Sequence, residues 1–426
     1  MPTPTKYAWT FKSRLRTGVL SWKSSHLACQ RLKEAVAEIE SVARRDPVTA
    51  ADGVVRLFER IWPAFQHVDT SSGALGGAVY WAQLELIPIV VGAQADRKTR
   101  NKWLDRLLTA IQDDGVDYLS TTQDHWGALC ASPETASKWA DEFLGTIRAA
   151  WSHPSPGGYV RESSLCLSSL VAAGRLQDAL DILAIERYPS WHLRKFAVDA
   201  LVAAGRAEEA LAFAEASRGL NQPDRAIDAA CEQILLDAGR AEEAYDEYAL
   251  TANESTTGLT TFRKLAKKYP SRDPQQILKD LAARSGDPGL WFAAAKDAGL
   301  LDLALDFAFA GRTDPRTLSR ACRDFVDDDP KWSLKIGRLA IQRLLDGQGY
   351  EPTDADAIEA FRHFMVAAER LGVADAATLD VLSLATAAKL KRGAFADTFL
   401  RQCSADPNAR PMAFQIPRTN KRRSRR

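Results

Sequence analysis

Histidine, cysteine and acidic side chains are the residues of this chain that could bind a metal or catalyse a reaction. Two local groupings stand out: His26 with Cys29, and Asp124-His125 with Cys130. Neither has the Cys-x-x-Cys or His-x-x-x-His spacing that directs two ligands to one metal. The chain also lacks the Gly-x-Ser-x-Gly, Gly-x-Gly-x-x-Gly and His-Glu-x-x-His motifs of well-known enzyme classes. We therefore expect no catalytic residues, no metal and no cofactor.

Four glycines that follow apolar segments set the organisation of the second half of the chain. They are Gly174, Gly205, Gly239 and Gly299, so the steps between them are 31, 34 and 60 residues. The last step is about twice the others and leaves room for one degenerate unit. Periods of this size indicate stacked helix pairs. Each glycine also suits the left-handed backbone position that ends a helix.

Alanine precedes each of these glycines and also lies five residues after it, as Ala204 and Ala210 do around Gly205. Small residues at fixed positions let the two helices of a hairpin approach closely. Acidic pairs such as Glu208 and Glu209 then fall in the first turn of the next helix, where the helix dipole favours negative charge.

These residues resemble the tetratricopeptide (TPR) superfamily, in which a glycine closes the first helix and an alanine five residues on lies in the second. The family's early Trp-Leu-Gly-Tyr pattern is missing, so we describe the repeats as TPR-like. The whole chain also resembles an uncharacterised group of bacterial helical-repeat proteins, a domain of unknown function, and that resemblance implies no activity. We expect an all-α fold: a right-handed α-solenoid of TPR-like helix hairpins, preceded by an N-terminal helical domain.

Three parts are expected along the chain. Residues 1–152 would form the N-terminal helical domain, and the proline- and glycine-rich segment 153–158 breaks the pattern. Residues 159–404 would form the TPR-like solenoid, with a last helix pair at about 375–404 as the cap that hides the final apolar face. Residues 405–426 turn to proline, asparagine and arginine, so we expect a disordered basic tail.

Apolar spacing predicts the helices of the N-terminal part. They cover residues 26–45, 47–66, 74–93, 97–112 and 133–151. Residues 7–23 are predicted to form a basic amphipathic helix, which either packs on its neighbour or binds a membrane surface or nucleic acid. The glycine-rich loop 69–77 is predicted to start a helix, with close packing through Gly76 and Gly77.

The charge of the chain is unevenly distributed, although its net value is only +1. Residues 1–33 and 410–426 each carry seven lysines and arginines and no acid, so residues 34–409 have a net charge of −13. No apolar run approaches the roughly 20 residues that span a bilayer, so we expect no membrane insertion. Six singly placed cysteines and the lack of a visible signal peptide favour a cytoplasmic location.

The repeat architecture predicts a non-catalytic scaffold for an unknown protein or peptide partner, because solenoids expose long grooves. In a TPR-like phase, first-helix positions at fixed distances before each glycine would line the groove, unless they are ordinary solvated positions. The candidate groove residues are Ser164, Ser168, His192, Lys195, Asp199, Val202, Gln233 and Leu236.

A nucleic-acid-associated accessory protein is the alternative function. Its basis is the tail from Arg418 onward, because arginine-rich segments bind phosphate backbones with little sequence preference. The candidate tail residues are Arg418, Lys421, Arg422, Arg423, Arg425 and Arg426. A solubilising terminus would have the same composition, and the acidic body argues against a broad nucleic-acid surface on the folded part. An enzyme is the least favoured function.

Overall fold

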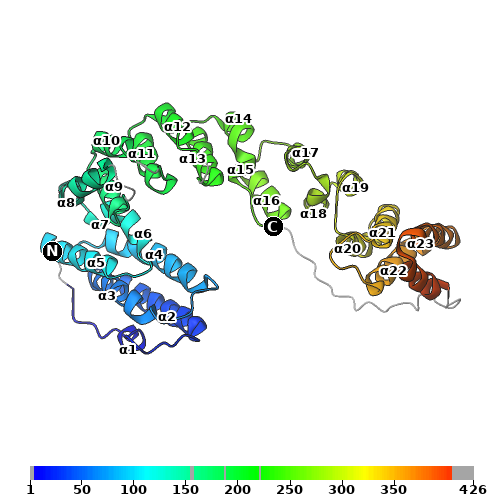
Figure 1. Ribbon diagram of the computed structural model, residues 1–426, viewed down its shortest axis with the longest axis horizontal. Helices are drawn as coiled ribbons and strands as arrows, with labels where there is room; N and C mark the ends of the chain where they lie inside the picture. Colours follow the sequence, from blue (N-terminus) through cyan, green and yellow to red (C-terminus); the bar gives the residue numbers. More distant parts are fainter. Residues whose placement is uncertain (1–3, 154–157, 187–188, 220–221, 405–426) are drawn as a thin grey trace. The chain divides into compact units, whose positions relative to one another are not determined.

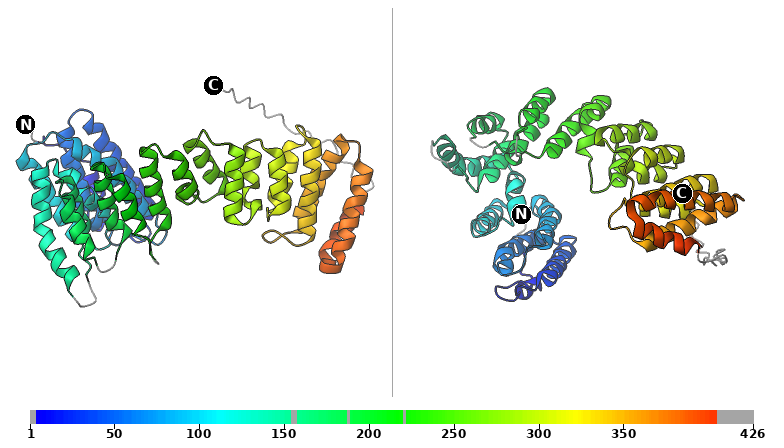
Figure 2. Two further views of the ribbon diagram at one scale, coloured as in Figure 1. Left: turned by 90° about the horizontal axis from the view of Figure 1, so that it is seen from above. Right: turned by 45° about the vertical axis from the view of Figure 1, so that its right-hand side comes forward.

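The computed structural model describes residues 4–153, 158–186, 189–219 and 222–404, and these residues form helices and no strand. The chain divides into two compact units, Met1–Arg240 and Ala241–Arg426. Within each unit, successive helices lie side by side as hairpins (Figures 1 and 2). The expected all-α solenoid of helix hairpins is therefore confirmed.

The first unit contains the helices up to α13. Their bounds are α1 Phe11–Arg14, α2 Ser25–Ala43, α3 Pro47–Phe65, α4 Ala74–Gly92, α5 Arg97–Gln112, α6 Ser120–Asp124, α7 Trp126–Cys130, α8 Pro133–Ser152, α9 Ser163–Ala172, α10 Leu176–Ala184, α11 Trp191–Ala203, α12 Ala207–Glu215 and α13 Asp224–Asp237.

The second unit contains the remaining helices. Their bounds are α14 Ala241–Ala244, the π-helix η1 Tyr245–Ala249, α15 Leu250–Ala252, α16 Gly258–Lys268, α17 Pro274–Ser285, the 3₁₀-helix η2 Pro288–Trp291, α18 Phe292–Asp297, α19 Leu301–Ala310, α20 Pro315–Phe325, α21 Pro330–Leu345, α22 Asp354–Arg370 and α23 Ala374–Ser404.

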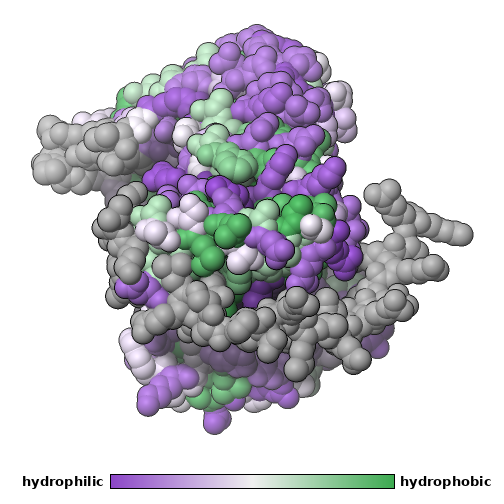
Figure 3. Space-filling view, turned by 90° about the vertical axis from the view of Figure 1, so that its right-hand side faces the viewer, coloured by the Kyte–Doolittle hydropathy of each residue, from purple (hydrophilic) through white to green (hydrophobic). Residues whose placement is uncertain are grey.

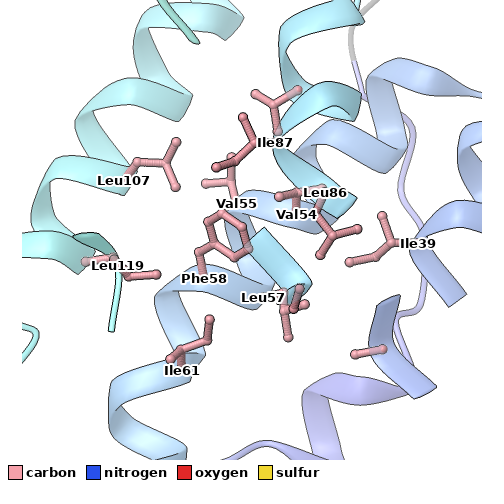
Figure 4. Close-up of a cluster of buried hydrophobic side chains, with 14 of the residues drawn as sticks. Ile39, Val54, Val55, Leu57, Phe58, Ile61, Leu86, Ile87, Leu107 and Leu119 are labelled. Atoms are coloured by element: carbon pink, nitrogen blue, oxygen red, sulfur yellow. The ribbon is translucent and has the colours of Figure 1, made fainter. Parts of the chain in front are cut away.

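Helices α2 to α5 enclose the core of the N-terminal part. Phe58 of α3 lies at its centre, with Leu107 of α5 and Leu86 of α4 among the apolar side chains around it (Figure 4). Side chains at the helix starts fix the boundaries of the elements. Asp46, Asp96 and Ser132 each accept a hydrogen bond from the backbone N–H three residues later, at the starts of α3, α5 and α8. The five helices expected in this part are present with nearly the expected bounds.

The basic helix expected at 7–23 is absent, and that prediction was wrong. Only Phe11–Arg14 is helical, and Gly18 adopts a left-handed conformation with φ = +76° that interrupts any longer helix. The segment is instead anchored by aromatic side chains, because the Trp9 indole packs directly on Gly53, where an added Cβ would lie 2.3 Å from it. Trp22, placed on the apolar face of the expected helix, is 64% exposed.

Each of the four repeat glycines lies just past the C-terminus of a helix and has a φ between +72° and +76°. At Gly205, the following N–H, of Arg206, donates to the carbonyl of Leu201 at 2.9 Å, and the glycine N–H donates to Val202 at 2.9 Å. The same two bonds occur at Gly174, Gly239 and Gly299, so each glycine closes a Schellman motif. Gly347 and Gly372 end α21 and α22 in the same way, which the repeat pattern did not predict.

The degenerate unit that the 60-residue step required is the hairpin of α16 and α17. Its turn contains Tyr269 and no left-handed glycine. Arg272 follows this turn and pairs with Glu242 of α14, with Nη2 to Oε2 at 2.6 Å. In the first unit Arg240, which follows the turn at Gly239, pairs in the same way with Glu208. An arginine after the turn and an acid in the preceding second helix thus connect adjacent repeats even where the glycine is lost.

The π-helix η1 accommodates one inserted residue. In the unit of Gly205 the fully buried alanines Ala210 and Ala214 are five and nine residues after the glycine. In the unit of Gly239 they are Ala244 and Ala249, five and ten residues after it. A single π-turn absorbs such an insertion while both alanines remain inside.

Three further features differ from expectation. The compact units divide at Arg240, whereas the sequence placed a boundary at 153–158, where α8 and α9 pack on each other; the expected domains stay a prediction about folding units. The last helix pair is wrong, since α23 is one continuous helix. The expected close packing of Gly76 and Gly77 is also wrong, because an added Cβ at either would meet no atom within 4 Å. The tail at 405–426 lies outside the described residues.

Candidate functional site

The candidate groove residues on α9 and α11 meet a segment of the chain's own N-terminal part, α6 and α7. The hydroxyl of Ser168 donates to the carbonyl of Asp124 at 2.8 Å and accepts a hydrogen bond from the N–H of Gly127 at 3.0 Å. An added Cβ at Gly127 would lie 2.2 Å from the Ser168 carbonyl oxygen, so only glycine permits this approach. Ser164 and Ser168 are 6% and 8% exposed, which leaves them almost no surface for a partner.

Asp124 is the centre of this contact. Its Oδ2 accepts a hydrogen bond from the Lys195 ammonium at 2.9 Å, and its Oδ1 lies 3.3 Å from Nε2 of His192. Burial acts to raise the pKa of the Asp124 carboxyl, but His192 and Lys195 together hold it below its ordinary value. The carboxyl side chain is 17% exposed, and Oδ1 accepts no hydrogen bond within the described residues. The two basic side chains of α11 therefore serve Asp124 and are not free for a partner.

The segment is fixed in place from its other side. The Gln83 side chain of α4 accepts hydrogen bonds from the N–H and the hydroxyl of Thr122, at 3.0 and 2.8 Å. Trp126 of α7 is fully buried and packs edge-on against Trp139. Because α6 and α7 belong to the core of the N-terminal helices, they occupy the first part of the candidate groove permanently.

Ser164, His192 and Asp124 have the residue types of a serine hydrolase, but their geometry does not fit one. Ser164 Oγ lies 2.9 Å from Nε2 of His192, and Asp124 contacts the same ring nitrogen. A general base needs the serine at one nitrogen and the orienting acid at the other. Two contacts to one nitrogen describe a structural polar cluster.

Further along α11 the candidate residues are accessible. Asp199 is exposed, its carboxylate accepts no hydrogen bond from the described residues, and Val202 is half-buried. Crowding by neighbouring protein atoms raises the pKa of Asp199, and the Lys195 charge opposes this. On α13, Gln233 is exposed and donates to Asp237 one turn later at 2.7 Å, while Leu236 is half-buried. The eight candidates thus separate into four around Asp124 and four on accessible surface.

The described residues contain no group of three or more histidine, cysteine or acidic side chains that could bind a metal ion. Burial raises the pKa values of Cys130, Cys166, Cys231 and Cys322 to about 12, so these thiols remain protonated at neutral pH. His125, noted for its proximity in sequence to Cys130, contacts the carbonyl of Thr121 through Nδ1 at 2.9 Å.

A pocket of about 450 Å³ in the second unit is lined by Asp287, Arg312, Arg343 and Asp346 among others. The Arg343 guanidinium is buried and donates to three backbone carbonyls around the end of α19, those of Ala308, Gly311 and Thr313. Two acids and two bases in the lining leave no preference for a charged ligand. The surface visible in Figure 3 is mostly hydrophilic, with hydrophobic side chains in small patches.

No family model matches the chain. No curated protein matches it either. Among solved structures it is similar to one described as a "circular tandem repeat protein with novel repeat topology and enhanced subunit contact surfaces", with 12% identity over 89% of each chain. The TM-score of 0.19 is too low to support any conclusion from this likeness. The chain's own helix hairpins make it a helical-repeat protein, and the finer resemblance to tetratricopeptide proteins stays a prediction.

Sequence reasoning missed Asp124 and Gly127 as partners of the repeats. Asp124 was considered only for metal binding with its neighbours in sequence. The segment around it has no apolar period and forms two short helices, so nothing local indicated a contact with α9 and α11.

Proposed function

We propose that the chain is a non-catalytic interaction scaffold whose partner, a protein or peptide, binds along the accessible candidate residues of α11 and α13. The observation that carries this proposal is the division of the candidate residues. Asp199, Val202, Gln233 and Leu236 keep accessible surface, whereas those around Asp124 are occupied by the chain itself. A free carboxylate beside half-buried apolar side chains suits a partner with apolar and cationic groups.

The proposal is supported by what the described residues offer in place of a catalytic site. Their thiols are protonated, their one Ser-His-Asp grouping has the wrong geometry, and they hold no metal-binding group. Helical repeats expose surface along successive first helices, which is how such folds bind extended partners.

Partner capture with a matched pair of variants tests this function. Val202→Glu places a charge on the proposed surface, and Ala203→Glu places the same charge on the adjacent exposed position of α11. The full-length protein and both variants would be used as baits in an extract of the native host, with circular dichroism to confirm folding. We expect specific partners to be lost with Val202→Glu and retained with Ala203→Glu. Equal recovery by all three baits would contradict the placement on α11.

A second candidate function rests on the composition of the tail, where six of the nine residues from Arg418 to Arg426 are basic. We propose nonspecific nucleic-acid binding as its role. Fluorescence anisotropy with labelled single- and double-stranded oligonucleotides would compare the full chain with a 1–409 truncation at several salt concentrations. Binding that falls steeply with salt and vanishes on truncation supports this role. Equal binding by the truncated protein would exclude the tail.

A further inference from the structure

Helix α4 has an apolar surface that its own unit does not cover. Its 19 residues contain one charged side chain, Glu85, and it is the one helix of the described chain that is long and apolar enough to cross a membrane by length and composition. A buried core helix passes the same test, and α4 does bury one side, including Leu75, Val79 and Leu86, against α2 and α3. A helix that packs on one side only would be polar on the other.

The opposite side of α4 is not polar. Tyr80, Trp81 and Leu84 are 56%, 37% and 41% exposed, and Pro88 is exposed as well. Gly77 lies on the same side, and an added Cβ there would meet no atom within 4 Å. These residues recur at the three- and four-residue spacing of one helix face.

The order of sizes along this face is symmetric about Leu84. Tyr80 and Pro88 lie four residues before and after it, and Gly77 and Val91 lie seven residues before and after it. We propose that α4 pairs with the α4 of a second copy of this chain, in an antiparallel contact with a twofold axis at Leu84. The axis brings the two Leu84 side chains together, places each Tyr80 ring on the Pro88 of the other copy, and sets each Gly77 opposite Val91.

The charges around the face favour a second copy over other occupants. An acidic or basic peptide would find no complementary charge, because Glu85 is the only ionised side chain on α4 and lies at the edge of the face. The twofold axis carries the two Glu85 side chains to opposite edges, so they do not oppose each other. An anionic membrane surface would be repelled by Glu85, and the nearby cations Arg97, Lys98 and Lys102 lie on α5, which packs on α3.

The size of the face sets the strength of the contact. A stable interface of standard size buries about 800 Å² on each partner. One face of a 19-residue helix supplies less than this, so the pairing should be a reversible dimer with a dissociation constant in the micromolar range.

Sedimentation equilibrium of the full-length protein over a range of micromolar concentrations tests the proposal. We expect a reversible monomer–dimer equilibrium whose dissociation constant rises at least about tenfold in Leu84→Lys, because two like charges then meet on the axis. Leu379→Lys is the matched control, since Leu379 is an exposed leucine on α23, and it should dimerise like the wild type. A monomer at all concentrations, or a dimer that Leu84→Lys leaves unchanged, would overturn the proposal.

Oxidative cross-linking locates the axis independently of affinity. Only a residue on a twofold axis meets its own copy, so Leu84→Cys should form a disulfide-linked dimer that neither Leu379→Cys nor the wild type forms. Flotation with phosphatidylcholine and phosphatidylglycerol vesicles examines the competing occupant. Flotation of the wild type that is lost in Leu84→Lys would assign the face to a membrane and overturn the pairing.

Discussion

The Lys195 ammonium lies 2.9 Å from Oδ2 of Asp124, a residue 71 positions earlier in the chain. This contact joins the first helix of a repeat to the short helices of the N-terminal part. It also explains why half of the candidate groove is unavailable to a partner. The surface that remains for recognition is the later part of α11, with the corresponding positions of α13.

The Asp124–Lys195 pair should contribute measurably to stability. Asp124→Asn leaves the partly buried ammonium without a charged partner, so we expect a loss of about 1–2 kcal/mol, below the cost of breaking a fully buried pair. Urea unfolding of Asp124→Asn, Lys195→Met and the double variant would give the coupling energy, expected near 1 kcal/mol. Lys267→Met, at an exposed position, should be nearly neutral. A coupling energy of zero would show that the pair is incidental.

The same pair predicts a specific dependence on pH. The pKa of Asp124 is lower in the folded protein than its ordinary value of 3.8, so the carboxylate stabilises the fold fully above that value. The contribution is lost as the pH falls through the lower, folded-state pKa. The difference in unfolding free energy between wild type and Asp124→Asn should therefore be constant near neutral pH and shrink below about pH 4. A difference that grows on acidification would contradict the assignment.

The repeats were predictable because their signal is local. A glycine with φ near +73° is required wherever a Schellman motif ends a helix, so Gly174 and Gly205 identify their turns directly from the sequence. The step of 60 residues also anticipated the hairpin at α16 and α17. The N-terminal helices were predictable for the same reason, since Asp46 and Ser132 cap their starts within three residues.

The rest depends on contacts between distant residues or on small changes of register. The pairing of Asp124 with α11 leaves no periodic trace in the sequence. The insertion before Ala249 shows only when buried positions of two repeats are compared. At 7–23, apolar spacing alone favoured a helix, whereas Gly18 and the packing of Trp9 on Gly53 determine the actual course of the chain.

Backbone strain can be separated from packing at two glycines. An added Cβ would meet no atom within 4 Å at either Gly205 or Gly145, but only Gly205 has a positive φ. Gly205→Ala should destabilise by about 1–2 kcal/mol through left-handed strain. Gly145→Ala, within α8, should stabilise by roughly 0.5–1 kcal/mol. Thermal unfolding of both variants checks this, and equal shifts would refute the turn assignment.

Gly311 should be more sensitive, for a different reason. Its φ of −127° suits any residue, but an added Cβ would lie 2.0 Å from the backbone nitrogen of Gly289. Because backbone atoms cannot move aside cheaply, Gly311→Ala should cost roughly 2–4 kcal/mol. Urea unfolding followed by circular dichroism would measure the loss. A cost no greater than that of Gly205→Ala would mean that the two segments do not cross closely.

Hydrogen exchange of the scaffold with a partner recovered by capture tests the central claim most directly. Amide protection would be compared between the free and the bound full-length protein by mass spectrometry. Binding at the proposed surface should increase protection in Trp191–Ala203 and Asp224–Asp237, while Ser120–Cys130, already held by the chain itself, stays unchanged. Protection confined to other helices, or exposure of Ser120–Cys130 on binding, would contradict the account.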